Sequence, residues 1–273
     1  MAIELGKLGI WRHYSGVDAQ FAAEAEKLGY SAIWLGGSPG GDLEYVDDLL
    51  GATESLVVAT GIVNIWQDEP ASIAKAYERI TGKYPDRFLL GVGAGHREAT
   101  KEYKKPYAAL VDYLDGLDAA GVPVAGRALA ALGPKVVKLS ADRTAGAHPY
   151  LVTPQHTREA REILGAGKLL APEHKVVLGT DAAEARAIGR NTVKFYLGLS
   201  NYVANLRKLG FTDEDLEGEG SDRLVDALAL HGDAATIATG VRAHLEAGAD
   251  HVNIQVLNED PWPAYRALAS DLL

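Results

Sequence analysis

The side chain best placed to do chemistry, His96, follows a short apolar run that begins at Phe88. The run comes after a Pro-Asp turn and predicts a strand that is buried on both faces. It ends in three alternate glycines: Gly91, Gly93 and Gly95. Such glycines remove side chains where a flat or bulky group must approach the backbone, although a loop that needs glycine only to turn has the same pattern. In the first case, His96 would face the group that lies there.

Composition excludes several kinds of site. The 273 residues contain no cysteine, which rules out disulfides, thiolate nucleophiles, zinc-thiolate sites and iron-sulfur clusters. A formal net charge of -10 argues against nucleic acid or an anionic membrane as the main partner, because both require clustered positive charge. The N-terminus has no signal-peptide pattern, and no apolar run approaches the ~18 residues of a membrane span. We therefore expect a cytoplasmic protein that acts on a small molecule.

Strand-like apolar runs alternate with helical patterns along the chain. Expected strands cover residues 8–11, 32–35, 56–63, the run that starts at 88, and residues 128–132, 145–152, 175–178 and 251–256. Expected helices cover residues 17–28, 42–55, 70–82, 103–120, a stretch ending at 141, residues 157–164, 181–209, a stretch ending at 247, and 262–272. Eight strand-helix units in about 250 residues are typical of a (β/α)8 TIM barrel. We predict one α/β domain, residues 1–273, with this fold and a helical insertion after the seventh strand; a doubly wound open sheet is the alternative.

In a TIM barrel the chemistry lies at the carboxyl ends of the strands. Those positions hold few paired carboxylates, and the chain has no HxH or HExxH pattern. Three histidines fall near strand ends, His13, His96 and His148, and could in principle bind a metal together. Because no acidic residue is placed to complete a divalent site, we predict no metal. Glycine, backbone and aromatic groups instead favour a large planar cofactor that brings its own reactivity.

A series of short motifs resembles one known family. Thr60-Gly-Ile-Val-Asn64, Pro70-Ala71 and Pro85-Asp-Arg-Phe-Leu-Leu-Gly-Val-Gly93 occur in that order, and further matches cover residues 130–135, 143–150, 153–157, 221–226 and 247–252. Through their number and order, the chain resembles the luciferase-like monooxygenase superfamily, and within it an actinobacterial-type subgroup of F420-dependent oxidoreductases. The resemblance covers nearly the whole chain. It implies hydride transfer between the deazaflavin coenzyme F420 and an unidentified small organic substrate.

The same resemblance implies a cofactor site along the third and fourth strands. Family members carry a non-prolyl cis peptide in the third strand, which here matches Gly61-Ile62 and would press on the middle ring of the deazaflavin. Further positions that match cofactor contacts of the family are Asn64, Ala94, Gly95, Gly146 and Ala147. The cationic side chains of Lys135, Lys138 and Arg143 could offset the negative charges of the cofactor tail, or be ordinary surface charge.

Two histidines compete for the proton-transfer role. Family members often end the second strand in an acid or a histidine, whereas this chain has Trp34-Leu-Gly-Gly-Ser38 there. The departure shifts the expected catalytic role to His96 or His13, because imidazole titrates near neutral pH. Trp66 and His148 are expected to line the substrate site, although Trp66 could also be a packed loop residue.

The resemblance leaves other functions open. The same fold binds FMN in monooxygenases that use reduced flavin and oxygen, and some relatives keep the barrel and have lost the flavin. A metal-dependent hydrolase on a similar barrel is a more distant alternative. From the family we expect a homodimer that forms through the helices around strands two to four. Neither the substrate nor the direction of hydride transfer follows from the sequence.

Overall fold

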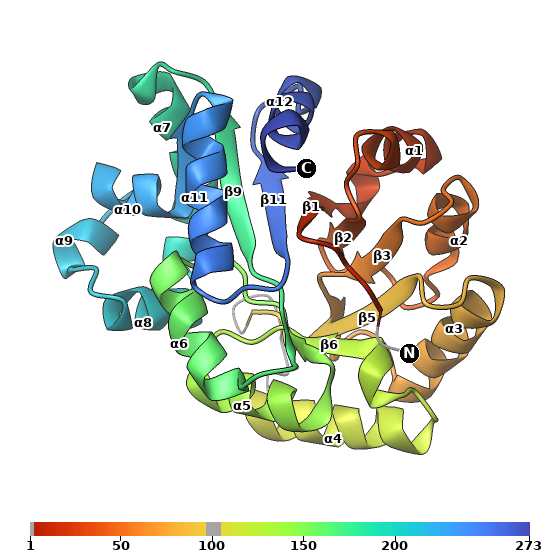
Figure 1. Ribbon diagram of the computed structural model, residues 1–273. Coiled ribbons are helices and arrows are strands. Elements are labelled where there is room, and N and C mark those ends of the chain that lie inside the picture. Colours follow the sequence, from red (N-terminus) through yellow and green to blue (C-terminus); the bar gives the residue numbers. More distant parts are fainter. Residues whose placement is uncertain (1–2, 97–104) are drawn as a thin grey trace.

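Strands and helices alternate along the chain, and the helices cover the outside of one curled sheet (Figure 1). The computed structural model describes residues 3–96 and 105–273. The strands are β1 (Leu8–His13), β2 (Ala32–Gly36), β3 (Val57–Thr60), β4 (Val63–Asn64), β5 (Phe88–Gly93), β6 (Arg127–Leu129), β7 (Gly146–Ala147), β8 (Leu169–Leu170), β9 (Glu173–Leu178), β10 (Ala229–Gly232) and β11 (Val252–Val256). The helices are α1 (Ala19–Lys27), α2 (Glu44–Gly51), α3 (Pro70–Lys83), α4 (Pro106–Ala119), α5 (Pro134–Arg143), α6 (Pro154–Leu164), α7 (Ala182–Leu197), α8 (Ser200–Lys208), α9 (Asp213–Leu216), α10 (Asp222–Leu228), α11 (Ala234–Glu246) and α12 (Trp262–Leu272). The pairs between these strands are parallel.

The sheet closes into a barrel through one interrupted strand. β11 pairs with β1, and β8 and β9 are separated only by Ala171 and Pro172. The Ala171 N–H donates to the Ala147 carbonyl at 2.9 Å on the β7 side, and the Asn253 N–H donates to the Pro172 carbonyl at 2.9 Å on the β11 side. The stretch from β8 to β9 therefore joins β7 to β11. Proline has no N–H to give to a ladder, which explains why the strand is interrupted there.

Large and small side chains alternate across the inside of the barrel. Trp11, Trp34, Ala59 and Leu89 lie opposite one another on β1, β2, β3 and β5 and belong to one buried cluster. Trp34 is fully buried, and the small side chain of Ala59 beside it leaves room for the indole. The floor of the barrel is thus packed core. Chemistry is confined to the mouth, where the strands end.

The surrounding helices begin with clear start signals. The Asp18 carboxylate accepts a hydrogen bond from the Phe21 N–H at 2.7 Å and caps α1. Proline occupies the first turn of α3, α4, α5 and α6. It is tolerated there because a backbone N–H in the first turn has no acceptor within the helix. On α3, Ile73 and Ile80 are fully buried in the cluster that includes Phe88 of β5. Burial of each such side chain stabilises the fold by about 1.5–3 kcal/mol.

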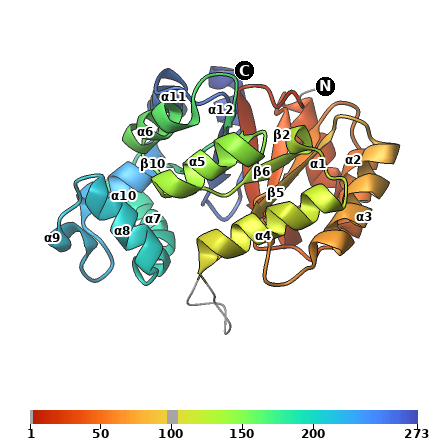
Figure 2. The ribbon, with the colours of Figure 1, turned by 90° about the horizontal axis from the view of Figure 1, so that it is seen from below.

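Helices α7 to α10 form an insertion with a core of its own. They lie together on the side of the barrel away from α1 to α3 in both views (Figures 1 and 2). Val193, Leu206 and Leu224 of these helices are buried in one cluster, and Leu151, which follows β7, belongs to the same cluster. Leu151 thereby joins the insertion to the barrel.

The predicted (β/α)8 barrel with a helical insertion after the seventh strand is confirmed, since β8 and β9 together are that seventh strand. One element was predicted wrongly, because residues 229–232 form strand β10 beside β9 where a helix was expected. Ala229 and Leu230 favour helix by propensity, but the ladder with β9 overrides that preference. The third predicted strand is split into β3 and β4. No helix in the described part of the chain has both the length and the apolar character to cross a membrane.

Candidate active site at the barrel mouth

The ends of β3 and β5 form one edge of the mouth. The Gly61-Ile62 peptide is cis, so this prediction from the resemblance is confirmed. Just before it, the Thr60 hydroxyl donates to the Gly91 carbonyl at 2.7 Å and accepts from the Gly91 N–H at 2.8 Å. A side-chain carbon on Gly91 would lie only 1.9 Å from the Thr60 carbonyl oxygen. Glycine is therefore required at position 91 by the neighbouring backbone and not by a ligand.

The other two glycines of this edge face side chains. A carbon on Gly93 would lie 2.9 Å from the Ala130 methyl group and 3.2 Å from Ile62. Gly95 has a φ of +59°, and a carbon there would lie 3.0 Å from the amide nitrogen of Asn64. Ile62, Asn64 and Gly95 are half-buried. Glycine is therefore required at position 93 by the packing of Ala130 and Ile62 against it, and at position 95 by its positive φ and by Asn64.

Trp66 links the loops that follow β4 and β5. Its indole N–H donates to the Ala94 carbonyl at 2.7 Å, and its backbone N–H donates to the Asn64 side-chain oxygen at 3.1 Å. The Asn64 oxygen is therefore used to shape its own loop, while its amide nitrogen lies toward Gly95. The structure brings together Asn64, Trp66, Ala94 and Gly95, as expected. Their contact with a cofactor stays a prediction.

His13 lies on the exposed rim after β1. Its Nδ1 accepts a hydrogen bond from the Ser15 N–H at 3.3 Å and lies 2.8 Å from the Ser15 hydroxyl. The ring stacks on Tyr14 with 4.9 Å between centres, and a carbon on Gly37 would come within 2.3 Å of its Nε2. Because the backbone donates to Nδ1, the neutral ring carries its proton on Nε2.

His96 lies against the insertion. Its ring centre is 5.6 Å from that of Tyr202 and 6.1 Å from that of Tyr196, and the residue is half-buried. Helices α7 and α8 therefore bring tyrosines to the histidine that ends the glycine stretch. Nothing in the local sequence around His96 indicates this contact, because Tyr196 and Tyr202 are about a hundred residues away in the chain.

His148 is buried inside the barrel. It is 2% exposed, its ring stacks on Trp34 with 4.1 Å between centres, and its Nδ1 donates to the Ala171 carbonyl at 2.7 Å. Burial, opposed by that hydrogen bond and reinforced by His251, lowers the pKa of His148 to about 4. The ring is therefore neutral at pH 7. His148 was predicted to line the substrate site, but most of it is barrel core, and only its Nε2 lies toward Gly61.

A buried ion pair lies on the insertion side of the mouth. The Lys175 Nζ is 2.9 and 3.1 Å from the two carboxylate oxygens of Glu173, and neither side chain is exposed. The Leu151 N–H donates to the same carboxylate at 3.0 Å. Burial raises the pKa of Glu173 and lowers the pKa of Lys175, and the opposite charge of the partner resists both shifts. Sequence reasoning missed this pair, although opposite charges two positions apart in a strand share one face.

Tyr150 lies between this ion pair and Trp11. Its ring centre is 3.8 Å from the Lys175 Nζ and 5.0 Å from the Trp11 ring. The Tyr196 hydroxyl donates to the Tyr150 hydroxyl at 2.9 Å, which donates to the Gln255 side-chain oxygen at 2.8 Å. Burial raises the pKa of Tyr150 well above its ordinary value, so both hydroxyls of this chain stay neutral. This side of the mouth is filled with side chains that hold one another.

Gly146 and Ala147 lie in the barrel wall and not at the mouth. Both are fully buried in β7, and a carbon on Gly146 would lie 1.9 Å from the Leu169 carbonyl oxygen. Ala147 packs with Val137 of α5 and Ala160 of α6 on the outside of the barrel. This position does not support their predicted contact with a cofactor tail, because neighbouring backbone and helices already occupy both sides.

The three cations considered for the cofactor tail have different surroundings. Arg143 binds Asp115 and Asp118, each at 2.7 Å, at the carboxyl end of α5, and Lys138 pairs with Asp142. Lys135 is exposed in the first turn of α5, which follows β6, and makes no ion pair with any described residue. Of the three, only Lys135 remains placed to meet an anionic group.

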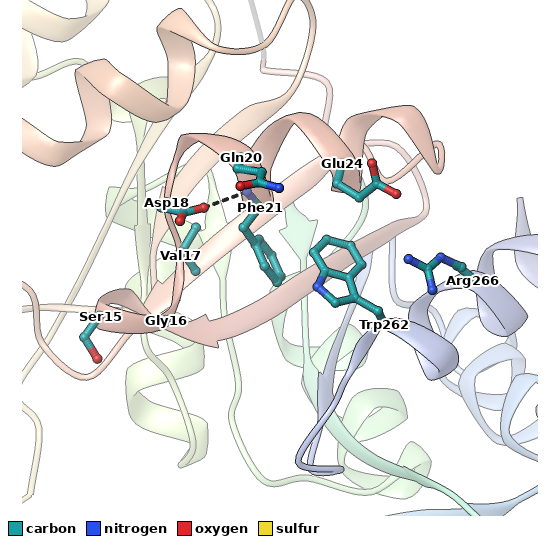
Figure 3. Close-up of a pocket in the computed structure, with 9 residues that line it drawn as sticks. All are labelled: Ser15, Gly16, Val17, Asp18, Gln20, Phe21, Glu24, Trp262 and Arg266. Carbon is teal, nitrogen blue, oxygen red and sulfur yellow. Dashed lines mark hydrogen bonds between the residues drawn. The ribbon is translucent and has the colours of Figure 1, made fainter.

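A separate groove of about 610 Å³ lies between α1 and α12 (Figure 3). Its aromatic floor is Phe21 against Trp262, with 4.8 Å between ring centres, and Asp18 at its edge is the cap of α1. Glu24 and Arg266 also line it. None of the residues predicted for the active site lines this groove.

Among the described residues, no three side chains of histidine, aspartate or glutamate lie close enough together to hold a metal ion. His13, His96 and His148 therefore do not form the metal site that the sequence left open.

Comparison with known proteins agrees with this architecture. Residues 18–121 match the family model of luciferase-like monooxygenases, whereas no curated protein sequence matches the chain. The fold is similar to that of an F420-dependent secondary alcohol dehydrogenase in complex with an F420-acetone adduct, with a TM-score of 0.75 and 14% identity over 98% of both chains.

Two further solved structures carry the same fold. One is a coenzyme F420-dependent tetrahydromethanopterin reductase from Methanopyrus kandleri, with a TM-score of 0.68 and 14% identity over 98% of this chain and 99% of that one. The other is the oxygenating constituent of 3,6-diketocamphane monooxygenase from Pseudomonas putida in complex with FMN, with a TM-score of 0.68 and 14% identity over 97% and 96%. At such identities the similarity establishes the fold, and residues 18–121 match the family model of luciferase-like monooxygenases.

Proposed function

We propose that the chain is an F420-dependent oxidoreductase that transfers a hydride between the deazaflavin and a small organic substrate. The observation that supports this best is the edge of the mouth where Ile62 lies beside Gly93 and Asn64 lies beside Gly95. A planar ring can lie against this edge because Ile62, Asn64 and Gly95 are only half-buried. Two of the solved structures with this fold are F420-dependent enzymes by their description.

The residues of this edge would hold the cofactor, which supplies hydride chemistry when it is bound. Ile62 would support the ring system. The Ala94 carbonyl is already occupied by the Trp66 indole, which leaves the Asn64 amide nitrogen as a hydrogen-bond donor on this edge. The positive end of α5 and the exposed Lys135 would meet the anionic tail of the cofactor.

A proton must move when the hydride reaches a carbonyl substrate or leaves an alcohol, and we assign this step to His96. It is half-buried beside Tyr196 and Tyr202, so water has limited access to it. His13 is the second candidate, but it lies on the exposed rim. General acid-base catalysis by one such group is worth about 10²–10⁴-fold in rate.

Binding measurements test the cofactor. The purified protein is titrated with oxidised F420 and separately with FMN, and the absorbance and fluorescence of each cofactor are followed. We expect a dissociation constant for F420 in the micromolar range or tighter, and weaker binding of FMN. Equal or tighter binding of FMN would favour an FMN-dependent monooxygenase, as in the 3,6-diketocamphane enzyme. Binding of neither would favour a relative that has lost the flavin.

A matched pair of variants tests the proton-transfer step. To find a turnover assay, reduced F420 is first screened against aldehydes, ketones and activated alkenes, and oxidised F420 against alcohols. His96→Ala should then lower turnover by about 10²-fold or more with little change in F420 affinity, whereas His13→Ala should have a much smaller effect. A fully active His96→Ala variant would exclude His96.

A further inference from the structure

Among the buried nitrogen atoms inside the barrel that have no hydrogen-bond partner in the described part of the chain, which include the Trp34 Nε1, two lie close to Gly61. They are the indole Nε1 of Trp11, a residue that is 8% exposed, and the imidazole Nε2 of His148, which is 2% exposed. Buried polar groups of folded proteins are nearly always hydrogen-bonded, and leaving one unpaired costs about 1–3 kcal/mol. Two such atoms side by side therefore call for a ligand that satisfies both.

The chemical roles of the two atoms differ and complement each other. An indole Nε1 is a donor only. The other ring nitrogen of His148, Nδ1, lies 2.7 Å from the Ala171 carbonyl, which can only accept, so Nδ1 carries the proton. Burial keeps the pKa of His148 at about 4, so at pH 7 its Nε2 holds a lone pair and is an acceptor.

Both atoms converge on Gly61. A carbon added to this glycine would lie 3.0 Å from the Trp11 Nε1 and 3.1 Å from the His148 Nε2. Both nitrogen atoms therefore face the same point beside Gly61, and they lie close enough together for one oxygen atom next to this glycine to bridge them. Any side chain larger than that of glycine would occupy the same space.

We propose that Trp11 and His148 bind a hydroxyl oxygen beside Gly61, which accepts a hydrogen bond from Trp11 and donates one to His148. A carboxylate or an unprotonated carbonyl cannot donate to His148, and an ammonium group cannot accept from Trp11. The nearby cation does not change this selection, because Lys175 is fully buried and hydrogen-bonded to both oxygens of Glu173. The site therefore selects a neutral hydroxyl group.

The hydroxyl can come from an ordered water molecule or from an alcohol substrate. The oxygen site itself does not depend on the cofactor. Only its use by a substrate rests on the proposed function, in which case Trp11 and His148 would hold the hydroxyl of an alcohol while its carbon faces the deazaflavin. His148 is then a positioning residue, because it orients the substrate and keeps its own proton on Nδ1.

High-resolution crystal structures of the protein, alone and soaked with 2-propanol, test the proposal. We expect an oxygen within about 2.7–3.2 Å of both nitrogen atoms. If the oxygen is present in the protein alone and stays after the soak, the site holds water. If the density becomes that of the alcohol, the site takes a substrate hydroxyl. If neither structure has an oxygen there, the proposal is wrong.

A titration in solution tests whether the site prefers a hydroxyl group to a carbonyl group. The indole N–H signal of Trp11 is assigned through the Trp11→Phe variant and followed during titration with 2-propanol and with acetone, which has the same carbon skeleton and no hydroxyl. If the alcohol binds, it should do so at least about tenfold more tightly than acetone, because acetone leaves His148 unpaired. Equal perturbation by both would contradict the hydroxyl assignment.

Variants complete the test. Trp11→Phe keeps the ring and removes the donor, and it should lose the oxygen from the crystal structure. Trp262→Phe, in the groove outside the barrel, should keep it. Retention of the oxygen in Trp11→Phe would contradict the proposal. F420 affinity is measured on the same variants, so a failure of the cofactor assignment is seen separately from a failure of the oxygen site.

Discussion

The two sides of the barrel mouth are built in opposite ways. On the side of β3 and β5, Ile62 and Gly95 are only half-buried, and Trp66 is held by a hydrogen bond to a backbone carbonyl. On the side of β7, β9 and the insertion, Tyr150 covers the Glu173–Lys175 ion pair, which has no exposed surface. One side offers space, and the other is filled with side chains.

This difference separates the residues that determine binding from those that determine stability. A ligand can lie on the glycine side without displacing large side chains. The packed side holds charges and hydroxyls in a dry environment, where each unpaired group would cost several kcal/mol. Substitutions on the packed side should therefore change folding most, and substitutions among the loop residues of the glycine side should change ligand binding most.

The largest expected effect comes from breaking the buried ion pair. Lys175→Met leaves the Glu173 carboxylate without its counter-charge inside the protein, where neither group is exposed. Loss of one partner of a buried pair typically destabilises a protein by about 3–5 kcal/mol. We expect a decrease of that size in the free energy of unfolding, measured by urea denaturation with circular dichroism.

Two controls make this prediction specific. Lys138→Met removes an exposed lysine that pairs with Asp142, and it should cost less than about 1 kcal/mol. The double variant with Glu173→Gln and Lys175→Met removes both charges and should recover much of the lost stability, since the amide oxygen can still accept from Leu151. If Lys175→Met costs no more than Lys138→Met, the packed side does not have the stabilising role described above.

Sequence reasoning found the glycine side and missed the packed side for a physical reason. Gly91, Gly93 and Gly95 stand together in the chain, so their spacing alone marks a strand end. The packed side is assembled from Tyr150, Tyr196 and residues of β9 that meet only after the insertion has folded onto the barrel. No local pattern encodes such contacts.

Local patterns also led to two assignments whose surroundings differ from those expected at a barrel mouth. Gly146 was interpreted as a cofactor contact. Glycine is required at this position because any side-chain carbon would lie 1.9 Å from the Leu169 carbonyl oxygen. His148 was placed at the substrate site because its segment ends a strand, but the alternation of side chains along that segment turns it into the barrel. Gly146 therefore serves close packing, whereas His148 is mostly core and turns only its Nε2 toward Gly61.

Replacement of Gly91, at the close contact between β3 and β5, should give the next largest effect. In Gly91→Ala the new methyl carbon would lie 1.9 Å from the Thr60 carbonyl oxygen, and only a shift of backbone can relieve that contact. Such overpacking costs about 1–3 kcal/mol or more. Gly82→Ala is the matched control, because Gly82 is exposed near the end of α3 with nothing within 4 Å, and it should stabilise the protein by about 0.5–1 kcal/mol. A Gly91→Ala variant as stable as the parent would contradict the close contact between β3 and β5.

Acid should destabilise the protein through its buried histidines. The pKa of His148 is lowered to about 4 and that of His244 to about 3, both mainly by burial, whereas the unfolded chain titrates near 6.5. The unfolded state therefore binds more protons below pH 6.5, so stability is full above that pH and is lost as the pH falls toward 4. Each histidine contributes about 1.4 kcal/mol per pH unit to the slope.

Urea denaturation at pH values from 7 to 4 measures this slope. In His148→Gln the slope should decrease by about 1.4 kcal/mol per pH unit, because one titrating group has been removed. The same variant should be less stable at pH 7, since the ring of His148 stacks on Trp34. An unchanged slope would mean that His148 is protonated as readily in the folded protein as in the unfolded chain.

The smallest expected effect on folding lies on the glycine side. Trp66→Phe removes the 2.7 Å hydrogen bond to the Ala94 carbonyl but keeps an aromatic ring in the loop, so it should cost about 1 kcal/mol of stability. Its effect on F420 affinity should be clearer, a decrease of several-fold, because the backbone of Ala94 and Gly95 is no longer held. Trp262→Phe, outside the barrel wall, should change neither property. If Trp66→Phe instead destabilises folding as strongly as Lys175→Met and leaves F420 affinity unchanged, the glycine side is structural core and the cofactor must bind elsewhere.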